Sequence, residues 1–227
     1  PEKGAVVIRT APTFLRFGHF QLLAARQEYD LLKQLTDWTI RRYFPEIEET
    51  DNADKYIAFF NAVTQKTIYL MVEWLRVGFV HGVMNTDNMS VLGLTIDYGP
   101  FSMLDEYDRR FTPNTTDLPG RRYAFGKQSE IALWNLYQFA NALLPLINDA
   151  KPLETILNAY RPRFYEAFRA IMSRKLGLDT FRESDETLLL QWQTLMDELP
   201  VDYTLFFVRL AEINRDGGFD TEVHFAP

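Results

Sequence analysis

The sequence contains no cysteine among its 227 residues, which excludes disulfide bonds, a cysteine nucleophile and thiolate metal sites. It also has no long basic run: 24 Lys and Arg against 31 Asp and Glu give a formal net charge of −7. This balance disfavours binding to duplex nucleic acid, where dense Lys and Arg supply the affinity. The longest apolar runs, such as 68–72, are far shorter than the ~20 residues needed to cross a bilayer. There is no signal segment after Pro1, so we expect a cytoplasmic protein that binds neither nucleic acid nor membrane.

What the sequence does contain is enough apolar material for a core, since 47% of the residues are hydrophobic and 15% are aromatic. The apolar residues recur at helical spacing over most of the chain. The pattern predicts helices over 14–44, 56–78, 129–147, 153–176, 184–199 and 202–217. A β-rich run at 5–9 predicts one strand, and residues 91–96 predict a short hairpin. The expected fold class is therefore mainly α with a small β element.

The segment 80–126 lacks helical periodicity and is rich in Gly, Pro, Asn, Asp and Thr, which is typical of functional loops or of disordered segments. Within it, Asn88 and Asp97 offer the hard oxygen ligands that suit Mg²⁺. Because the two residues flank the predicted hairpin, we expect them to converge on one metal ion that also contacts phosphates.

The spacing of this loop resembles that of protein kinases. His81 and Asn88 are seven residues apart, as in the kinase pattern His-Arg-Asp-x-x-x-x-Asn, and Asp97-Tyr98-Gly99 resembles Asp-Phe-Gly. Val83, however, stands where a kinase has its catalytic Asp, and valine cannot accept a proton. An acid occurs instead at Asp87, beside the expected metal ligand. The loop therefore predicts a kinase-like site that is either inactive or performs a different reaction, with His81 in a structural role.

The chain resembles the selenoprotein O family of pseudokinases, which are protein adenylyltransferases. The resemblance covers much of the first 150 residues and rests on the strings 11–20, 81–90, 92–101 and 120–126. In that family ATP is thought to bind flipped relative to a kinase, so that AMP is transferred to Ser, Thr or Tyr hydroxyls of proteins, with targets in redox homeostasis.

The resemblance also implies roles for individual residues. Asn88 and Asp97 would hold Mg²⁺ or Mn²⁺, Asp87 would be the candidate base, and Arg9 and Arg16 would grip the terminal phosphate of the substrate ATP. Fixed guanidinium groups suit a pyrophosphate leaving group, because they are always charged and donate in a fork.

Two features of the family are missing from these residues: the Lys–Glu pair with its glycine-containing nucleotide loop, and the C-terminal redox cysteine or selenocysteine. The resemblance therefore implies a single kinase-like C-lobe over 1–227. Residues 1–10 would be a strand left from the N-lobe or hinge side, 80–126 the catalytic and metal loops, and 129–217 a helical subdomain. We expect such a segment of a longer protein to bind ATP weakly and to be inactive alone.

Two other functions stay open. A silent pseudokinase scaffold would bind nucleotide or a partner without catalysis, although it would not need both metal ligands. A small-molecule phosphotransferase of the aminoglycoside kinase type also has a loop that begins His-Gly, but it would require Asp at the position of Val83.

Overall fold

The computed structural model describes residues 4, 6, 8–47 and 52–212. As predicted, the chain is mainly helical. The helices are α1 (Phe17–Ala25), α2 (Tyr29–Tyr43), α3 (Asn52–Val77), α4 (Gln128–Ile147), α5 (Lys151–Asn158), α6 (Tyr160–Lys175), α7 (Asp185–Glu198) and α8 (Tyr203–Glu212). Short 3₁₀ turns occur at η1 (Thr86–Asn88), η2 (Thr115–Asp117) and η3 (Phe125–Lys127), and the strands are β1 (Phe79–Val80) and β2 (Ser102–Met103).

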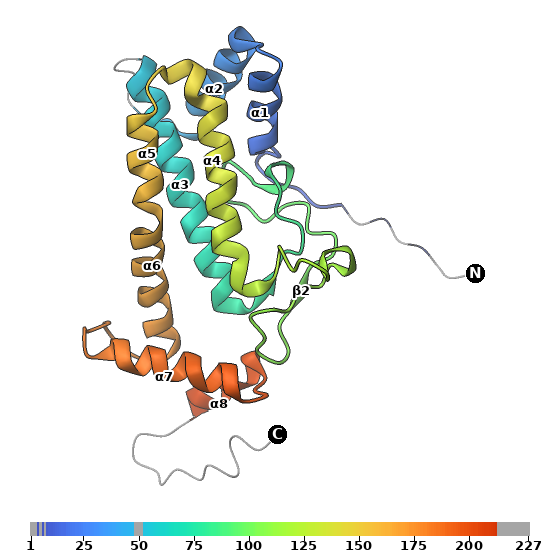
Figure 1. Ribbon diagram of the computed structural model, residues 1–227, viewed down its shortest axis with the longest axis vertical. Coiled ribbons are helices and arrows are strands. Elements are labelled where there is room, and N and C mark those ends of the chain that lie inside the picture. The colour runs from blue at the N-terminus through green and yellow to red at the C-terminus, as the bar shows by residue number, and fades with distance from the viewer. Residues whose placement is uncertain (1–3, 5, 7, 48–51, 213–227) are drawn as a thin grey trace.

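The long helices run side by side along the long axis of the molecule (Figure 1). Helix α3 packs against both α4 and α6, and α1 packs against α4. Helices α7 and α8 lie across one end of this bundle, and the loop-rich segment between α3 and α4 covers one flank (Figure 1). Within the described part of the chain, no helix combines the length and apolar character needed to cross a membrane.

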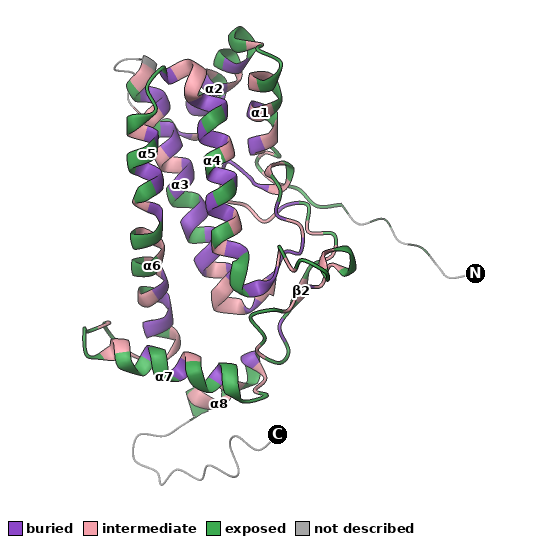
Figure 2. Ribbon diagram, viewed as in Figure 1, coloured by how far each residue is buried: buried purple, intermediate pink, exposed green. Residues whose placement is uncertain are grey.

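An aromatic cluster joins three of the helices and buries their facing sides (Figure 2). Phe139 of α4 stacks on Phe17 of α1 with ring centroids 4.6 Å apart, and meets Phe20 edge to face at 5.2 Å. Phe59 of α3 meets the same ring edge to face at 5.9 Å. All four side chains are fully buried. Because buried aromatic rings contribute large apolar areas, this cluster fixes α1 against the bundle and so fixes the residues just before it.

Several helix boundaries differ from the sequence prediction. The helix expected over 14–44 is two helices, because Gln27 adopts a left-handed conformation with φ of 58°. The helix expected over 153–176 is likewise interrupted at Ala159, between α5 and α6. The end predicted at Gly78 is confirmed: its φ is +74°, and a Cβ there would lie 2.9 Å from the ring of Tyr203.

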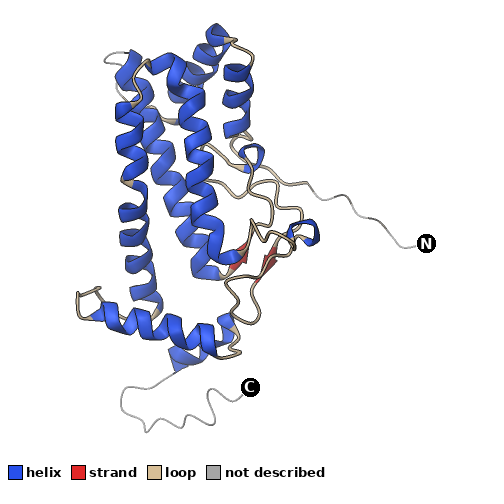
Figure 3. Cartoon of the chain, viewed as in Figure 1, coloured by secondary structure: helices blue, strands red, loops and turns tan. Residues whose placement is uncertain are grey.

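The hairpin predicted over 91–96 is wrong. This segment lies against α3 instead of pairing with itself, and a Cβ on Gly93 would come within 2.7 Å of the carbonyl oxygen of Lys66. Trp74 also donates a hydrogen bond from Nε1 to Thr95 Oγ1 at 2.9 Å. The antiparallel pair forms at other residues, with Phe79 opposite Met103, and it encloses the whole loop 81–101 (Figure 3).

The ends of the chain fall only partly within the described residues. Of the strand expected over 5–9, residues 5 and 7 lie outside them, and Val6, Ile8 and Arg9 are exposed and without regular structure. The last predicted helix is described as α8 up to Glu212, and its expected continuation over 213–217 lies outside the described residues.

Candidate active site

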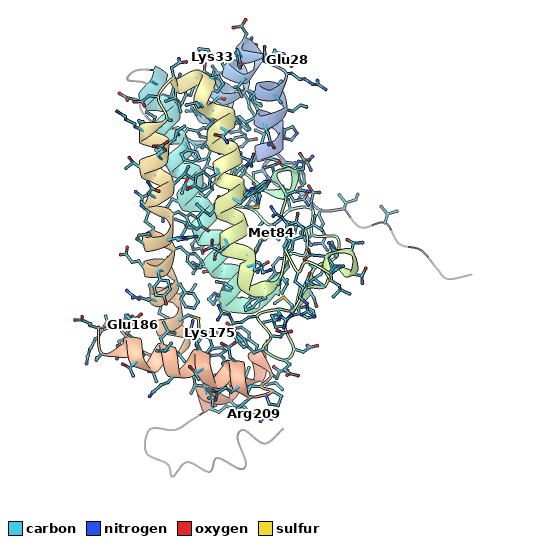
Figure 4. All side chains as sticks on the ribbon, viewed as in Figure 1. Glu28, Lys33, Met84, Lys175, Glu186 and Arg209 are labelled. Atoms are coloured by element: carbon cyan, nitrogen blue, oxygen red, sulfur yellow. The ribbon has the colours of Figure 1, made fainter. Side chains whose placement is uncertain are left out.

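The loop between β1 and β2 is held on α4 by two buried amide side chains. Gln128 accepts a hydrogen bond from the backbone N–H of His81 at 3.0 Å and donates one to the carbonyl oxygen of Phe79 at 2.9 Å. Asn135, two turns further along α4, donates to the carbonyl oxygen of Met84 at 2.9 Å. Figure 4 shows Met84 beside α4, on the flank that carries the loops. These bonds satisfy backbone groups that would otherwise be buried without partners, and they fix the loop in one position.

His81 connects the two halves of the loop. Its side chain is fully buried, and its Nε2 lies 2.7 Å from the carbonyl oxygen of Ile96. Its Nδ1 accepts a hydrogen bond from the backbone N–H of Val83 at 3.3 Å. This pattern places the proton of the neutral ring on Nε2, and burial lowers the pKa of His81. The ring is therefore a neutral bridge between backbone segments, which confirms the structural role expected for it.

The turn η1 presents Asp87 and Asn88 next to each other. Asn85 caps this turn, because its side-chain oxygen accepts a hydrogen bond from the backbone N–H of Asp87 at 3.1 Å. Asn88 donates from Nδ2 to the carbonyl oxygen of Val83 at 2.9 Å. Since the amide nitrogen is used in this way, the orientation of the amide is set and Oδ1 remains available as a ligand. Among the described residues, Oδ1 of Asn88 has no hydrogen-bond partner.

The carboxylate of Asp87 lies over the first turn of α1. A Cβ built on Gly18 would be 2.0 Å from Oδ1 of Asp87, so only glycine leaves room for this carboxylate. The N-terminal turn of a helix has unpaired N–H groups and a partial positive charge, which favours a nearby negative charge. In the same turn of the loop, Thr86 donates a hydrogen bond to Gln21 of α1 at 2.7 Å. Asp87 is exposed and therefore accessible to another molecule.

Backbone pairing brings the predicted arginine Arg16 to the loop. Arg16 and Ser90 form an antiparallel bridge, and Phe17 donates to the carbonyl oxygen of Met89 at 3.0 Å. Nη1 of Arg16 then lies 2.5 Å from Oδ2 of Asp97, with the two side chains 32% and 43% exposed. Asp97 has a φ of 52°, an uncommon left-handed conformation that sets the direction of its side chain. Two of the predicted site residues are thus in direct contact.

Arg9 lies next to the same segment. Its guanidinium carbon is 4.6 Å from the centre of the Tyr98 ring, the residue that follows Asp97. Tyr98 in turn meets Phe79 and Phe101, with ring centroids 6.4 and 5.4 Å away. A cation over an aromatic face is attracted by about 0.5–1 kcal/mol at exposed sites. This contact places a second guanidinium on the residue that follows Asp97 in the chain.

Asn88 and Asp97 are connected through the loop and not by direct contact of their side chains. Asn88 bonds to the carbonyl of Val83, the N–H of Val83 bonds to His81, and His81 bonds to the carbonyl of Ile96, next to Asp97. The three hydrogen bonds measure 2.9, 3.3 and 2.7 Å in that order. The chain of bonds fixes the relative position of the two expected metal ligands.

The donor set fits a divalent cation that is shared with phosphate groups. The described residues contain no cluster of three or more His, Asp or Glu side chains that would hold a metal ion by themselves. One amide oxygen and one carboxylate are what Mg²⁺ takes from a protein when a nucleotide supplies the other ligands. Arg16 contacts only Oδ2 of Asp97, so Oδ1 is left for such an ion.

Sequence reasoning missed the residues that support this site, namely Gly18, Gln128 and Asn135. Gln128 and Asn135 carried a usable signal, because they are polar residues seven apart on a helix face that is otherwise apolar. His19 also supports the site, because its Nδ1 accepts a hydrogen bond from the backbone N–H of Arg16 at 3.1 Å. For Gly18 the sequence offered no signal, since its role depends on a residue 69 positions away.

Comparison with known proteins identifies similar sequences among protein adenylyltransferases and nucleotidyltransferases. Residues 1–225 match the family model described as "Protein adenylyltransferase SelO". The chain is 50% identical over 222 residues to "Protein nucleotidyltransferase YdiU" of Cytophaga hutchinsonii, covering 98% of this chain and 42% of that protein. Proteins of the same name from Flavobacterium johnsoniae and Azoarcus sp. are 48% and 50% identical, with 94% of this chain and 41% of each protein covered. The chain thus spans about two fifths of the length of these relatives.

Proposed function

Because this chain belongs to the protein adenylyltransferase SelO family, we propose that it carries the catalytic loops of an enzyme that transfers AMP from ATP to Ser, Thr or Tyr hydroxyls of proteins. The observation that carries this proposal is the hydrogen-bonded connection from Asn88 through His81 to the segment of Asp97. It links the backbone segments of Asn88 and Asp97, whose side-chain oxygens would serve as ligands of a nucleotide-bound cation. Since ATP is the substrate, we place the activity in the cytoplasm.

Asn88 and Asp97 would hold Mg²⁺ or Mn²⁺ together with the phosphates of ATP. The ion would neutralise phosphate charge and stabilise the transition state of the transfer. The neighbours of Asn88 and Asp97 hold both side chains in the orientation that binding of the ion would require. Val83 and His81 fix the amide of Asn88, and Arg16 orients Asp97 by contact with one of its carboxylate oxygens.

Arg9 and Arg16 would bind the terminal phosphates, which leave as pyrophosphate. Guanidinium groups stay charged at every physiological pH and donate in a planar fork that matches phosphate oxygens. The guanidinium of Arg16 contacts Asp97, and that of Arg9 lies over the ring of the next residue, Tyr98. In this position they stabilise negative charge as it accumulates on the leaving group.

Asp87 would act as the base. The oxygen of the target hydroxyl attacks the α-phosphorus, its proton passes to the carboxylate of Asp87, and the bond between the α-phosphorus and the bridging oxygen of pyrophosphate breaks. Asp87 is exposed at the loop surface and is held in place by the first turn of α1. Proton transfer to a positioned carboxylate contributes roughly 10²–10⁴-fold to rate.

We further propose that the helical chain is the C-lobe of a kinase-like fold and that the activity needs residues beyond it. The antiparallel pair β1–β2, enclosing a loop with Asn88 and Asp97, resembles the arrangement of kinase metal loops. The Lys–Glu pair of the nucleotide cleft has no candidate in the sequence. We therefore expect the intact protein to bind ATP more tightly than this segment.

The test is to incubate the intact protein and candidate target proteins with Mg²⁺ and ATP labelled separately at the α and γ phosphates. We expect α-label on protein and no γ-label. Transfer of γ-label to protein would contradict AMP transfer and indicate a kinase, whereas γ-label on a small acceptor would indicate a phosphotransferase. Tight ATP binding with neither label transferred would indicate the silent scaffold.

A further inference from the structure

A cluster of positively charged side chains lies outside the proposed active site, in the loop segment 109–127. A pocket of about 380 Å³ occurs there. Its lining includes four cationic side chains and two apolar ones, Arg109, Arg110, Arg121, Lys127, Leu118 and Pro119. None of the described residues that line it is acidic. In a chain with a net charge of −7, such a pocket is a local exception.

In the part of the chain that the structure describes, no acid near this pocket forms an ion pair with Arg110, Arg121 or Lys127. Asp117 uses both carboxylate oxygens on the loop itself, accepting from the backbone N–H groups of Arg122 and Tyr123 at 2.8 Å each. Asp108 accepts from the backbone N–H of Arg110 and not from its guanidinium. The nearest ion pair joins Arg109 to Asp197 of α7 at 3.7 Å, between two exposed side chains, and such pairs are weak.

The pocket is held in its shape before any ligand arrives. The two ends of the loop are joined by a hydrogen bond from the N–H of Gly126 to the carbonyl of Arg109 at 2.9 Å. Arg121 donates from Nη1 to the carbonyl of Arg110 at 2.9 Å, which positions its guanidinium and leaves further N–H groups free. Binding to a site that is already ordered loses less conformational entropy.

The same loop is bonded to the loop that carries Asp87. Asn114 donates from Nδ2 to the carbonyl oxygen of Gly82 at 3.0 Å. Lys127 immediately precedes Gln128, which binds the backbone of His81. The cationic pocket and the proposed base therefore belong to one connected framework.

We infer that this pocket binds an acidic segment of the protein whose hydroxyl receives AMP, an inference that rests on the proposed function. Guanidinium groups recognise carboxylates in a bidentate manner. A single exposed ion pair is worth only roughly two- to fivefold in affinity, so several carboxylates are needed to fill four cationic positions. The apolar rim, where Leu118 is 49% exposed, suits a polypeptide better than a free inorganic anion.

The test measures binding and not catalysis. A short fluorescent peptide with one Thr among Glu and Asp residues is titrated with the intact protein, beside the same peptide with Gln and Asn in their place. We expect the acidic peptide to bind at least about tenfold more tightly at ~0.15 M salt, and less tightly as salt rises. Equal affinity of the two peptides would overturn the inference.

Matched variants locate the binding. Arg110→Glu with Lys127→Glu is expected to remove the preference for the acidic peptide. The control is Lys151→Glu, which makes the same charge change as Lys127→Glu but lies on α5, away from the loop-covered flank (Figure 1). It is expected to leave peptide binding unchanged. If the pocket variant retains the preference, or loses only the binding of inorganic phosphate, the pocket does not hold an acidic segment. Unfolding temperatures that match the unmodified protein verify that the variants are folded.

The labelled ATP separates failure of this inference from failure of the proposed function. Equal α-label transfer to both peptides would overturn the acidic preference and leave AMP transfer in place. Charge-dependent peptide binding by a protein that transfers no α-label would support the pocket and contradict the proposed function.

Discussion

The residues of the proposed site are positioned mainly by backbone groups and small residues. Asn88 is oriented by the carbonyl of Val83, and His81 is oriented by the carbonyl of Ile96. Gly18 leaves the space that the carboxylate of Asp87 occupies. The role proposed for each side chain thus depends on neighbouring residues that have no catalytic or metal-binding role themselves.

The carboxylate of Asp87 gives a prediction at this scale. Asp87→Asn keeps the size of the side chain but cannot take the proton, so we expect α-label transfer to fall by roughly 10²–10⁴-fold with ATP affinity nearly unchanged. Gly18→Ala places a methyl group where Oδ1 of Asp87 lies, and should lower transfer by displacing the same carboxylate.

The control for this pair is Asp105→Asn, which changes an exposed carboxylate just after β2. Transfer by Asp87→Asn within threefold of the unmodified protein, at the level of this control, would show that Asp87 is not the base. Gly18→Ala is informative only if its free energy of unfolding is preserved. Alanine has a higher helix propensity than glycine by roughly 1 kcal/mol, so this is expected.

At the scale of the elements, the junction of α6 with α7 and α8 has a titratable group, Lys175, at its centre (Figure 4). Lys175 at the end of α6 donates a hydrogen bond to the carbonyl of Arg76. Its Nζ lies 4.1 Å from the ring centre of Tyr203 and 3.8 Å from that of Phe207. The rings attract the ammonium group, but burial and the charge of Arg76 outweigh them and lower the pKa of Lys175 to about 8.

This lowered pKa predicts a pH dependence of stability. Between about pH 8 and its ordinary pKa of 10.5, the unfolded chain binds a proton at Lys175 that the folded chain has lost. The free energy of unfolding should therefore rise with pH in this window and should not change with pH through Lys175 below it, where both states carry the proton. Above about pH 10 the trend reverses, because burial raises the pKa of Tyr107 to about 12 and that of Tyr203 further still.

Urea unfolding of the protein and of Lys175→Met between pH 7 and pH 10 measures this effect. Methionine fills a similar volume and packs well against aromatic rings, so the junction should persist without the titration. The unmodified protein should gain stability relative to the variant as the pH rises. Parallel curves would mean that the pKa of Lys175 is not lowered in the folded state.

At the scale of the whole molecule, the sequence predicted the helical class and most helices, because their apolar faces repeat with helical spacing. The sequence prediction failed where tertiary contacts determine the local structure. The residues 91–96 have strand propensity, but Gly93 and Thr95 pack on α3, so the hairpin does not form. The break at Gln27 depends on a left-handed residue that periodicity does not reveal.

For the candidate site, the sequence predicted the residues but not the contacts between them. Asn88 and Asp97 were predicted from the spacing of the loop, and the roles of Asp87, Arg9 and Arg16 from the resemblance to the family; the structure gathers them around one loop. The ion pair between Arg16 and Asp97 was not predictable, because it joins residues 81 positions apart through the bridge to Ser90. The cationic pocket of 109–127 was not predicted either, since its arginines come from two separate Arg-Arg pairs, 109–110 and 121–122, that only the folded loop brings together.

A divalent cation shared by Asn88 and Asp97 is central to the proposed function, and its effect on nucleotide affinity is measurable without turnover. Calorimetry of the intact protein with an ATP analogue that cannot be cleaved between the α and β phosphates, with and without Mn²⁺, gives this quantity. We expect the metal to raise affinity by about tenfold or more in the unmodified protein and in Asp105→Asn, and hardly at all in Asn88→Ala or Asp97→Asn. A metal-dependent gain that is undiminished in both site variants would contradict the account.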